Sequence, residues 1–148
     1  MKRIHVAIMR KSWGLTRKIL TGEKTIESRW YKNRYKPWGE IEVGDDIYFK
    51  DSDSPVTIKA TVGKVLQFDR LTPKKVEELL KGYAKADGLG IEKRQINKYF
   101  QMFKNKKYCL IIFLKEPKKI KPFNIDKTGF GSMASWLIVD TINKLKRK

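Results

Sequence analysis

The chain has 148 residues, of which 41% are hydrophobic and 34% are charged, a mixture that is large enough to fold as one domain without a metal or disulfide staple. Cys109 is the only cysteine, which excludes a disulfide framework and favours a reducing, cytoplasmic compartment. Lysine and arginine outnumber aspartate and glutamate by 34 to 16, so the net charge of +18 favours a polyanionic partner, with nucleic acid as the first candidate.

Metal and membrane roles are disfavoured by the same composition. His5 and Cys109 are the only soft ligands, so no zinc spacing exists, and we predict no metal and no cofactor. We expect His5 to be a strand residue and Cys109 a buried small hydrophobe. The apolar stretch 4–9 is far shorter than the ~18 residues of a membrane span and too short for a signal sequence, so we expect no membrane association.

The first third of the chain predicts a strand, a short helix and a second strand. Alternating apolar residues indicate the strand at 4–9, and Leu15 and Ile19, four residues apart, indicate a helix over 15–21 that ends at Gly22. In the next strand, 25–30, Glu27 and Arg29 share one face. Lys24 has the opposite parity, so it joins them only if the chain is still turning between residues 22 and 24.

Residues 31–38 lack a clean period and end in a Pro-Trp-Gly turn, which predicts a loop or an edge segment. Rings alternate with cations here, an arrangement that suits stacking on unpaired bases. Tyr31 and Tyr35 favour a surface that meets bases, whereas core packing and base stacking are equally good interpretations of Trp30 and Trp38.

The remainder of the chain alternates strands with helices. Strands are expected at 47–49, 56–62, 65–68 and 108–114, followed by a basic loop at 115–121 and a short last strand at 123–125. Thr72 and Pro73 begin one helix, and an aromatic stripe predicts another over 96–103. A C-terminal helix over 132–145 is expected as an appendage. The pattern predicts an α+β domain with a small, mixed, partly closed sheet and flanking helices.

Residues 22–29 read Gly22-x-Lys24-x-x-Glu27-x-Arg29, which resembles the GxKxxExR signature of the ASCH domain in the PUA-like superfamily. The resemblance covers residues 4–125 and leads us to treat 1–148 as a single domain. It implies a PUA-like, partly closed β-barrel with a cleft between its helices, lined by the signature. It also implies that RNA or a nucleotide is the ligand.

Some proteins with this signature hydrolyse the amide of N4-acetylcytidine, using the lysine, a threonine three residues later and an acid before a later helix. Lys24 matches the lysine. Glu27 occupies the position of the threonine, and Asp87 best matches the acid, where that subgroup has glutamate. Because the threonine hydroxyl is the natural nucleophile, its loss counts against this activity.

The sequence thus leaves several functions open. The first is an RNA- or nucleotide-binding module, in which cations hold phosphates and rings stack on bases; its candidate residues are Arg17, Lys18, Lys24, Arg29, Tyr31, Lys32, Arg34, Tyr35 and Trp38. The second is an amidohydrolase or a ribonuclease that uses Lys24, Glu27 and Asp87. An acidic protein partner is a third, and a purely structural ion pair between Lys24 and Glu27 is the alternative to any chemistry. RNA is preferred to duplex DNA because no DNA-reading helix motif is apparent.

Overall fold

The computed structural model of the chain describes residues 2–84, 88–131 and 133–147. These residues form a six-stranded mixed sheet in the order β2-β5-β4-β3-β1-β6. Its strands are β1 (Ile4–Met9), β2 (Ile26–Tyr31), β3 (Asp46–Asp51), β4 (Val56–Phe68), β5 (Tyr108–Phe123) and β6 (Trp136–Val139). The helices are α1 (Leu15–Thr21), α2 (Pro73–Tyr83) and α3 (Ile96–Phe103), with short 3-10 turns η1 (Lys11–Trp13), η2 (Lys93–Gln95) and η3 (Ile142–Lys144).

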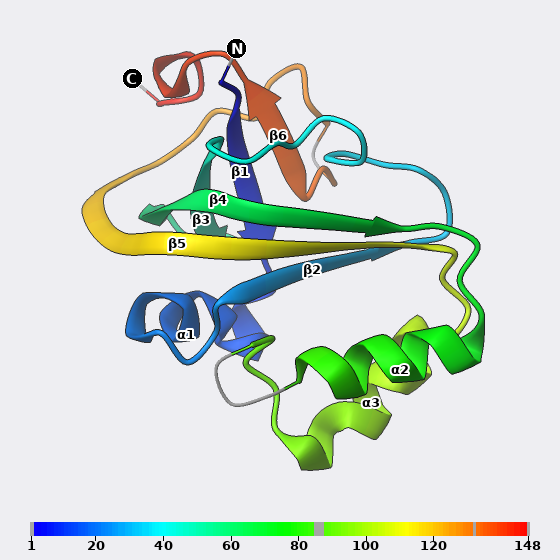
Figure 1. Cartoon of the computed structure of the whole chain (residues 1–148). Helices are drawn as coiled ribbons and strands as arrows, with labels where there is room; N and C mark the ends of the chain where they lie inside the picture. The colour runs from blue at the N-terminus through cyan, green and yellow to red at the C-terminus, as the bar shows by residue number, and fades with distance from the viewer. Residues whose placement is uncertain (1, 85–87, 132, 148) are drawn as a thin grey trace.

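The sheet curls into a partly closed barrel with helices beside it (Figure 1). Only β1 and β3 pair in parallel; the other neighbouring strands are antiparallel. β2 and β6 are the two edge strands, and β5 lies between β2 and β4, which confirms the expected central strand at 108–114. None of the described helices is long and apolar enough to cross a membrane.

Three apolar clusters hold the layers together. The barrel interior packs against α1 through residues such as Ile19, Phe49 and Leu110. The outer face of β2 and β5 packs against α2 and α3 around Trp30 and Ile111. A third cluster joins the outer face of β1 and β3 to the C-terminal segment; its buried members are Val6, Tyr48, Val56, Ile125, Leu137 and Leu145.

The helices expected at 15–21, from Thr72 and at 96–103 are confirmed, and the strands expected at 47–49 and 56–62 are present as the antiparallel pair β3 and β4. α1 spans the predicted residues and ends at Gly22, which adopts the left-handed conformation at φ 84°. Thr72 caps α2 by accepting a hydrogen bond from the Lys75 backbone N–H, as the Thr-Pro pair predicted. Cys109 is fully buried, and burial raises the pKa of its thiol.

The expected basic loop at 115–121 is wrong, because these residues continue β5 as a strand of 16 residues. Likewise, residues 65–68 and Phe123 belong to β4 and β5 and form no separate strands. The two strands pair along their length through three register shifts. Such irregularities break the strict alternation that identifies a strand in a sequence, so this half of β5 appeared to be a loop.

The expected C-terminal helix over 132–145 is also wrong for the described residues. They form β6, which pairs antiparallel with β1, followed by the 3-10 turn η3. Trp136 packs into the barrel interior and Leu137 packs into the outer cluster, which is the two-faced burial of a strand. Met133, which the helical pattern placed on the apolar face, is 92% exposed. The segment is therefore part of the sheet.

Candidate functional site

The chain is still turning where the signature begins, which is the condition that Lys24 needed to reach Glu27. Gly22 reverses the chain, and the Lys24 backbone N–H donates to the Lys18 carbonyl oxygen at 3.0 Å. Residues 25 and 26 then donate their N–H groups to the Gly88 carbonyl oxygen. The loop around residue 88 is thus fixed against the start of β2, and the Lys24 side chain is enclosed between them.

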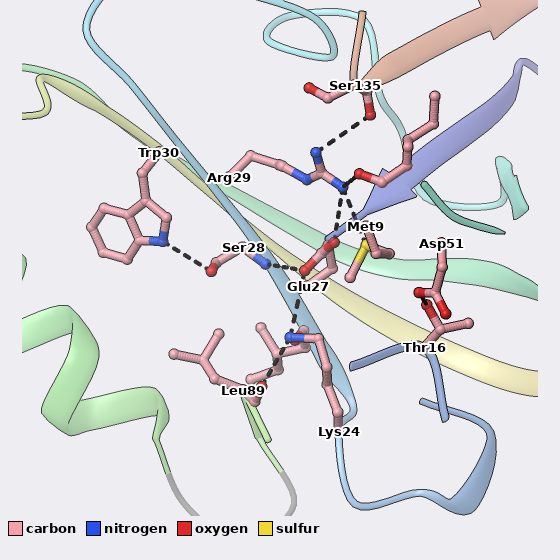
Figure 2. Close-up of polar contacts among 12 residues, drawn as sticks. Met9, Thr16, Lys24, Glu27, Ser28, Arg29, Trp30, Asp51, Leu89 and Ser135 are labelled. Carbon is pink, nitrogen blue, oxygen red and sulfur yellow. Dashed lines mark hydrogen bonds and ion pairs between the residues drawn. The ribbon is translucent and has the colours of Figure 1, made fainter. Parts of the chain in front are cut away.

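The ammonium group of Lys24 is buried and makes three polar contacts (Figure 2). Lys24 is 3% exposed, and its Nζ donates to the carbonyl oxygens of Ile26 at 2.6 Å and Leu89 at 2.9 Å. Glu27 Oε1 lies 3.4 Å from the same Nζ. Burial lowers the pKa of Lys24, and the carboxylate of Glu27 opposes that shift. Since an ammonium group has three donors, these contacts occupy all of them.

Glu27 is buried and bridges two cations. Its Oε1 accepts the Ser28 backbone N–H at 3.0 Å, and its Oε2 lies 3.2 Å from the Arg29 guanidinium. The Ser28 hydroxyl accepts the indole N–H of Trp30 at 2.9 Å. A carboxylate has four lone-pair positions, and the contacts of Glu27 with the described residues account for three of them.

Arg29 joins the two edges of the open barrel. From β2, its guanidinium donates to the carbonyl oxygen of Ile8 at the end of β1 and to that of Ser135 just before β6, at 3.3 and 3.4 Å. It also lies 5.0 Å from the ring centroid of Trp136. No backbone hydrogen bond joins β2 to β6 in the described part of the chain. Side-chain contacts of Arg29 therefore hold a seam that backbone pairing leaves open.

A buried polar chain supports the ring under Arg29. Trp136 Nε1 donates to His5 Nδ1 at 2.9 Å, and His5 Nε2 lies 2.9 Å from Asp45 Oδ2. Because an indole N–H only donates, Nδ1 must be unprotonated, so the imidazole is neutral and donates through Nε2. Burial lowers the pKa of His5, against the opposing effect of Asp45. Burial alone would raise the pKa of Asp45. Its carboxylate accepts hydrogen bonds from His5 and from the backbone N–H groups of Arg3 and Glu42, and together these bonds lower the pKa.

A cavity of about 520 Å³ lies beside these residues. Polar groups of the signature and of the β1 and β6 ends line one part, and rings and apolar side chains from η1, β2 and α3 line the rest. The rings of Trp13 and Tyr99 pack edge to face, with their centroids 5.6 Å apart. The ring of Trp30 stacks on that of Phe103, with a centroid distance of 4.9 Å. The polar and aromatic residues that line the cavity include Arg10, Trp13, Lys24, Glu27, Ser28, Arg29, Trp30, Tyr31, Tyr99, Lys106 and Ser135.

The structure brings only some of the predicted residues to this cavity. Lys24, Glu27, Arg29 and Tyr31 line it. Lys18 instead lines a second cavity of about 1140 Å³ beside α2 and α3. The predicted residues that line neither cavity are Arg17, Lys32, Arg34, Tyr35 and Trp38. Asp87, the candidate acid, lies outside the described residues.

The rings of residues 31–38 differ in their surroundings. Tyr31 is half-buried, and its hydroxyl donates to the Lys36 carbonyl oxygen at 2.8 Å. Burial raises the pKa of Tyr31 to about 12. Tyr35 is 43% exposed and meets Tyr31 edge to face. Trp38 is half-buried against Tyr108 and the barrel interior.

Several cavity residues were missed in the sequence. Arg10 and Trp13 lie just after β1, and Lys106 lies just before β5. The sequence signal that could have identified them is a cation or an aromatic ring next to the end of a strand. Tyr99 belonged to an aromatic stripe that was assigned to the core; it is buried and also lines the cavity. Ser135 gave no signal, because the segment was expected to be helical. Within the described ranges, no group of three or more His, Cys, Asp or Glu side chains could hold a metal ion.

The fold of the chain is similar to that of several solved structures. A mutant of the ASCH protein from Zymomonas mobilis matches with a TM-score of 0.65 and 19% identity, over 92% of this chain and 89% of that chain. The ASCH protein itself matches with a TM-score of 0.64 and 19% identity, over 92% and 87%. The N-terminal domain of Staphylothermus marinus McrB matches with a TM-score of 0.50 and 14% identity, over 80% and 75%.

These likenesses show that the chain shares the fold of the ASCH structures, which confirms the predicted α+β architecture with a partly closed barrel. The match to the Zymomonas mobilis structures extends over most of this chain. The sequence matches no protein-family model and no curated protein.

Proposed function

We propose that this protein binds RNA or a nucleotide, with a base held in the cavity beside β2. The observation that carries the proposal is the cavity itself, which is lined both by aromatic rings and by the buried charged groups of the signature. Its volume of about 520 Å³ lies in the range of small-ligand sites, which is about 300–1,000 Å³. The ASCH fold and the signature of residues 22–29 support the same ligand class, because the resemblance implies RNA or nucleotide binding.

Within this proposal, the charged residues have different tasks. Lys24 is saturated by its three acceptors, so it orients Glu27 and the loop at Leu89 and is poorly placed to contact a phosphate. The Glu27 carboxylate is the acceptor for an amino group of a base. Arg10 is exposed at the cavity, where its guanidinium lies 4.9 Å from the Trp13 ring, and Lys106 is half-buried there; both suit the phosphate of a bound nucleotide.

The predicted binding residues that lie away from the cavity belong to the same proposal. Tyr35 and Trp38 would stack on bases of a longer RNA, and the phosphates would lie against Lys32 and Arg34 of the same loop and, farther along the chain surface, against Arg17 and Lys18 of α1. A cytoplasmic location is also part of it, because the one cysteine is a free thiol.

A hydrolase is the second candidate, favoured by one observation. Burial lowers the pKa of Lys24 in a cavity that also holds the Glu27 carboxylate. Against it, the Nζ group of Lys24 has no donor left for a substrate, and both oxygens of Glu27 face cations. Sustained turnover of N4-acetylcytidine or RNA by purified protein, abolished in Glu27→Gln, would establish the enzyme and displace simple binding.

Tryptophan fluorescence tests the binding site directly, because Trp13 and Trp30 line the cavity. We expect AMP or CMP to quench the fluorescence in a saturable way. Trp13→Ala should weaken that binding by about 10-fold or more, since stacking on a base contributes about 1–3 kcal/mol.

The matched control is Trp38→Ala, which removes a half-buried tryptophan outside the cavity and should leave mononucleotide affinity unchanged. Equal losses in both variants would contradict the placement of the base. If no mononucleotide binds and RNA is captured only together with an acidic protein, the third candidate, a protein-interaction module, is favoured.

A further inference from the structure

The outward face of the β4–β5 pair carries cations that the cavity does not use. Four lysines lie there, on neighbouring strands within a few residues of one another: Lys59, Lys64, Lys115 and Lys118. We call these four residues the basic arm. α2 and α3 cover one end of the two strands and the C-terminal segment lies beyond their other side, so this stretch is not covered by a helix (Figure 1).

The pairing of the strands brings the lysines together. Lys59 lies directly opposite Lys118, and Lys115 lies opposite Thr61. The Lys115 stem crosses Gly63, where an added Cβ would come within 2.8 Å of Lys115 Cγ. Gly63 therefore leaves room for that side chain to lie flat on the sheet.

This arrangement works against folding stability. Like charges on directly opposed strand positions repel. Among the described residues, Lys59 has one ion pair, with Asp46 at 3.6 Å, and Lys2 shares that carboxylate at 3.1 Å. Lys64, Lys115 and Lys118 are exposed, and none of the ion pairs in the described part of the chain involves them. The ring of Phe113 under Lys64 adds a flat apolar surface among the charges.

We propose that the basic arm is a second nucleic-acid contact, which holds the phosphate backbone of single-stranded RNA outside the cavity. The stretch from position 59 to 64 of β4 is about 17 Å long at 3.4 Å per residue, which equals about five nucleotides of a stacked strand. The arm begins next to the signature, because the Leu114 N–H donates to the Thr25 carbonyl oxygen. The proposal deepens the proposed function and rests on it, since it makes the ligand a polynucleotide.

The test separates local contacts from net charge. One variant combines Lys64→Gln, Lys115→Gln and Lys118→Gln, which keeps the Lys59–Asp46 pair. The control combines Lys74→Gln, Lys93→Gln and Lys98→Gln, three exposed lysines on or beside α2 and α3, and changes the net charge equally. Binding of a fluorescein-labelled 20-nucleotide oligouridylate is followed by anisotropy across a salt series, and binding of AMP by tryptophan fluorescence.

For the 20-mer, we expect the slope of log K against log salt concentration to be less steep by about 2 in the arm variant than in the wild type. Each lost phosphate contact reduces the steepness by about 0.7, and three lysines are replaced. The control should keep most of the slope, and AMP affinity should stay unchanged in both variants. An unchanged slope in the arm variant, or equal losses in arm and control variants, overturns the inference. Failure of the wild type to bind AMP, with arm-dependent binding of the 20-mer intact, overturns the cavity proposal instead.

Discussion

The Lys24 ammonium shows how a single residue can define the local structure of the site. It ties together the start of β2, the loop at Leu89 and the Glu27 carboxylate, all inside a buried region. Its replacement would remove a donor from the carbonyl oxygens of Ile26 and Leu89 and one of the two cations from the Glu27 carboxylate, all in a low-dielectric environment. Burying a charge without its partner costs more than the intact pair contributes.

Lys24→Met should therefore lower the free energy of unfolding by about 3–5 kcal/mol, measured by urea denaturation. Lys18→Met is the matched control: Lys18 is half-exposed and donates one hydrogen bond, to the Gly90 carbonyl oxygen, so its loss should cost about 1 kcal/mol. Equal effects of the two substitutions would show that Lys24 is not the anchor of the loop.

His5 gives the protein a defined response to acid. Its pKa is lowered in the folded state, because burial and the hydrogen bond from Trp136 both favour the neutral ring. The unfolded chain binds a proton at pH 6.5 and below, before the folded chain does, so stability falls as the pH falls through this range. His5 is the only histidine of the chain.

We expect the free energy of unfolding to decrease by up to about 1.4 kcal/mol per pH unit between pH 6.5 and 5. His5→Gln should be less stable at pH 7 yet have a nearly flat profile in that range. Urea denaturation at several pH values measures both. A flat profile in the wild type would mean that the ring is protonated in the folded state.

At the scale of elements, β6 contributes both to the site and to the core. Its first residue, Trp136, and the preceding Ser135 lie against Arg29, while Leu137 packs on the opposite face with Leu145. The strand therefore closes the barrel interior and supports the cavity at the same time.

Leu137→Ala should lower the free energy of unfolding by about 2–5 kcal/mol, because the side chain is 1% exposed. Met133→Ala in the same segment should change it by less than about 0.5 kcal/mol, since Met133 is 92% exposed. Chemical denaturation distinguishes these values. Comparable losses in both variants would instead agree with the amphipathic helix that the sequence predicts, in which Met133 and Leu137 share one face.

Short-range patterns identified most elements of the fold. Helix caps such as Thr72, the glycine at residue 22 and the clean alternation of 56–62 depend on local chemistry, which a sequence displays. The wrong predictions fall in segments whose secondary structure depends on pairing with strands that are distant in the sequence. The second half of β5 is a strand because β4 pairs with it through register shifts, and β6 is a strand because β1 offers it an edge.

The same distinction holds for the site. Lys24, Glu27 and Arg29 were found because they stand within six residues, although only the turn at Gly22 brings Lys24 to the others. Trp13, Tyr99, Lys106 and Ser135 come from separate segments that the fold brings to the cavity. Their spacing in the sequence does not indicate that these residues lie together in the fold.

For the whole molecule, ligand binding should appear as added stability. A ligand that binds only the folded chain stabilises it by about 2.7 kcal/mol at a concentration 100 times its Kd. AMP should therefore shift the urea midpoint of the wild type upward and that of Trp13→Ala much less at the same concentration. An unchanged wild-type midpoint at saturating AMP would contradict binding in the cavity.

The seam between β2 and the start of β6 has a mechanical consequence. Elsewhere the neighbouring strands of the barrel wall are joined by backbone pairing, but here the guanidinium of Arg29 spans the gap through two single contacts of 3.3 and 3.4 Å. The wall therefore has one soft line, and it runs along the cavity. If the cavity holds a base, as we propose, a bulky base would enlarge the cavity by displacing the Arg29 side chain, so the reach of Arg29 would limit the size of the ligand more than the resting volume does.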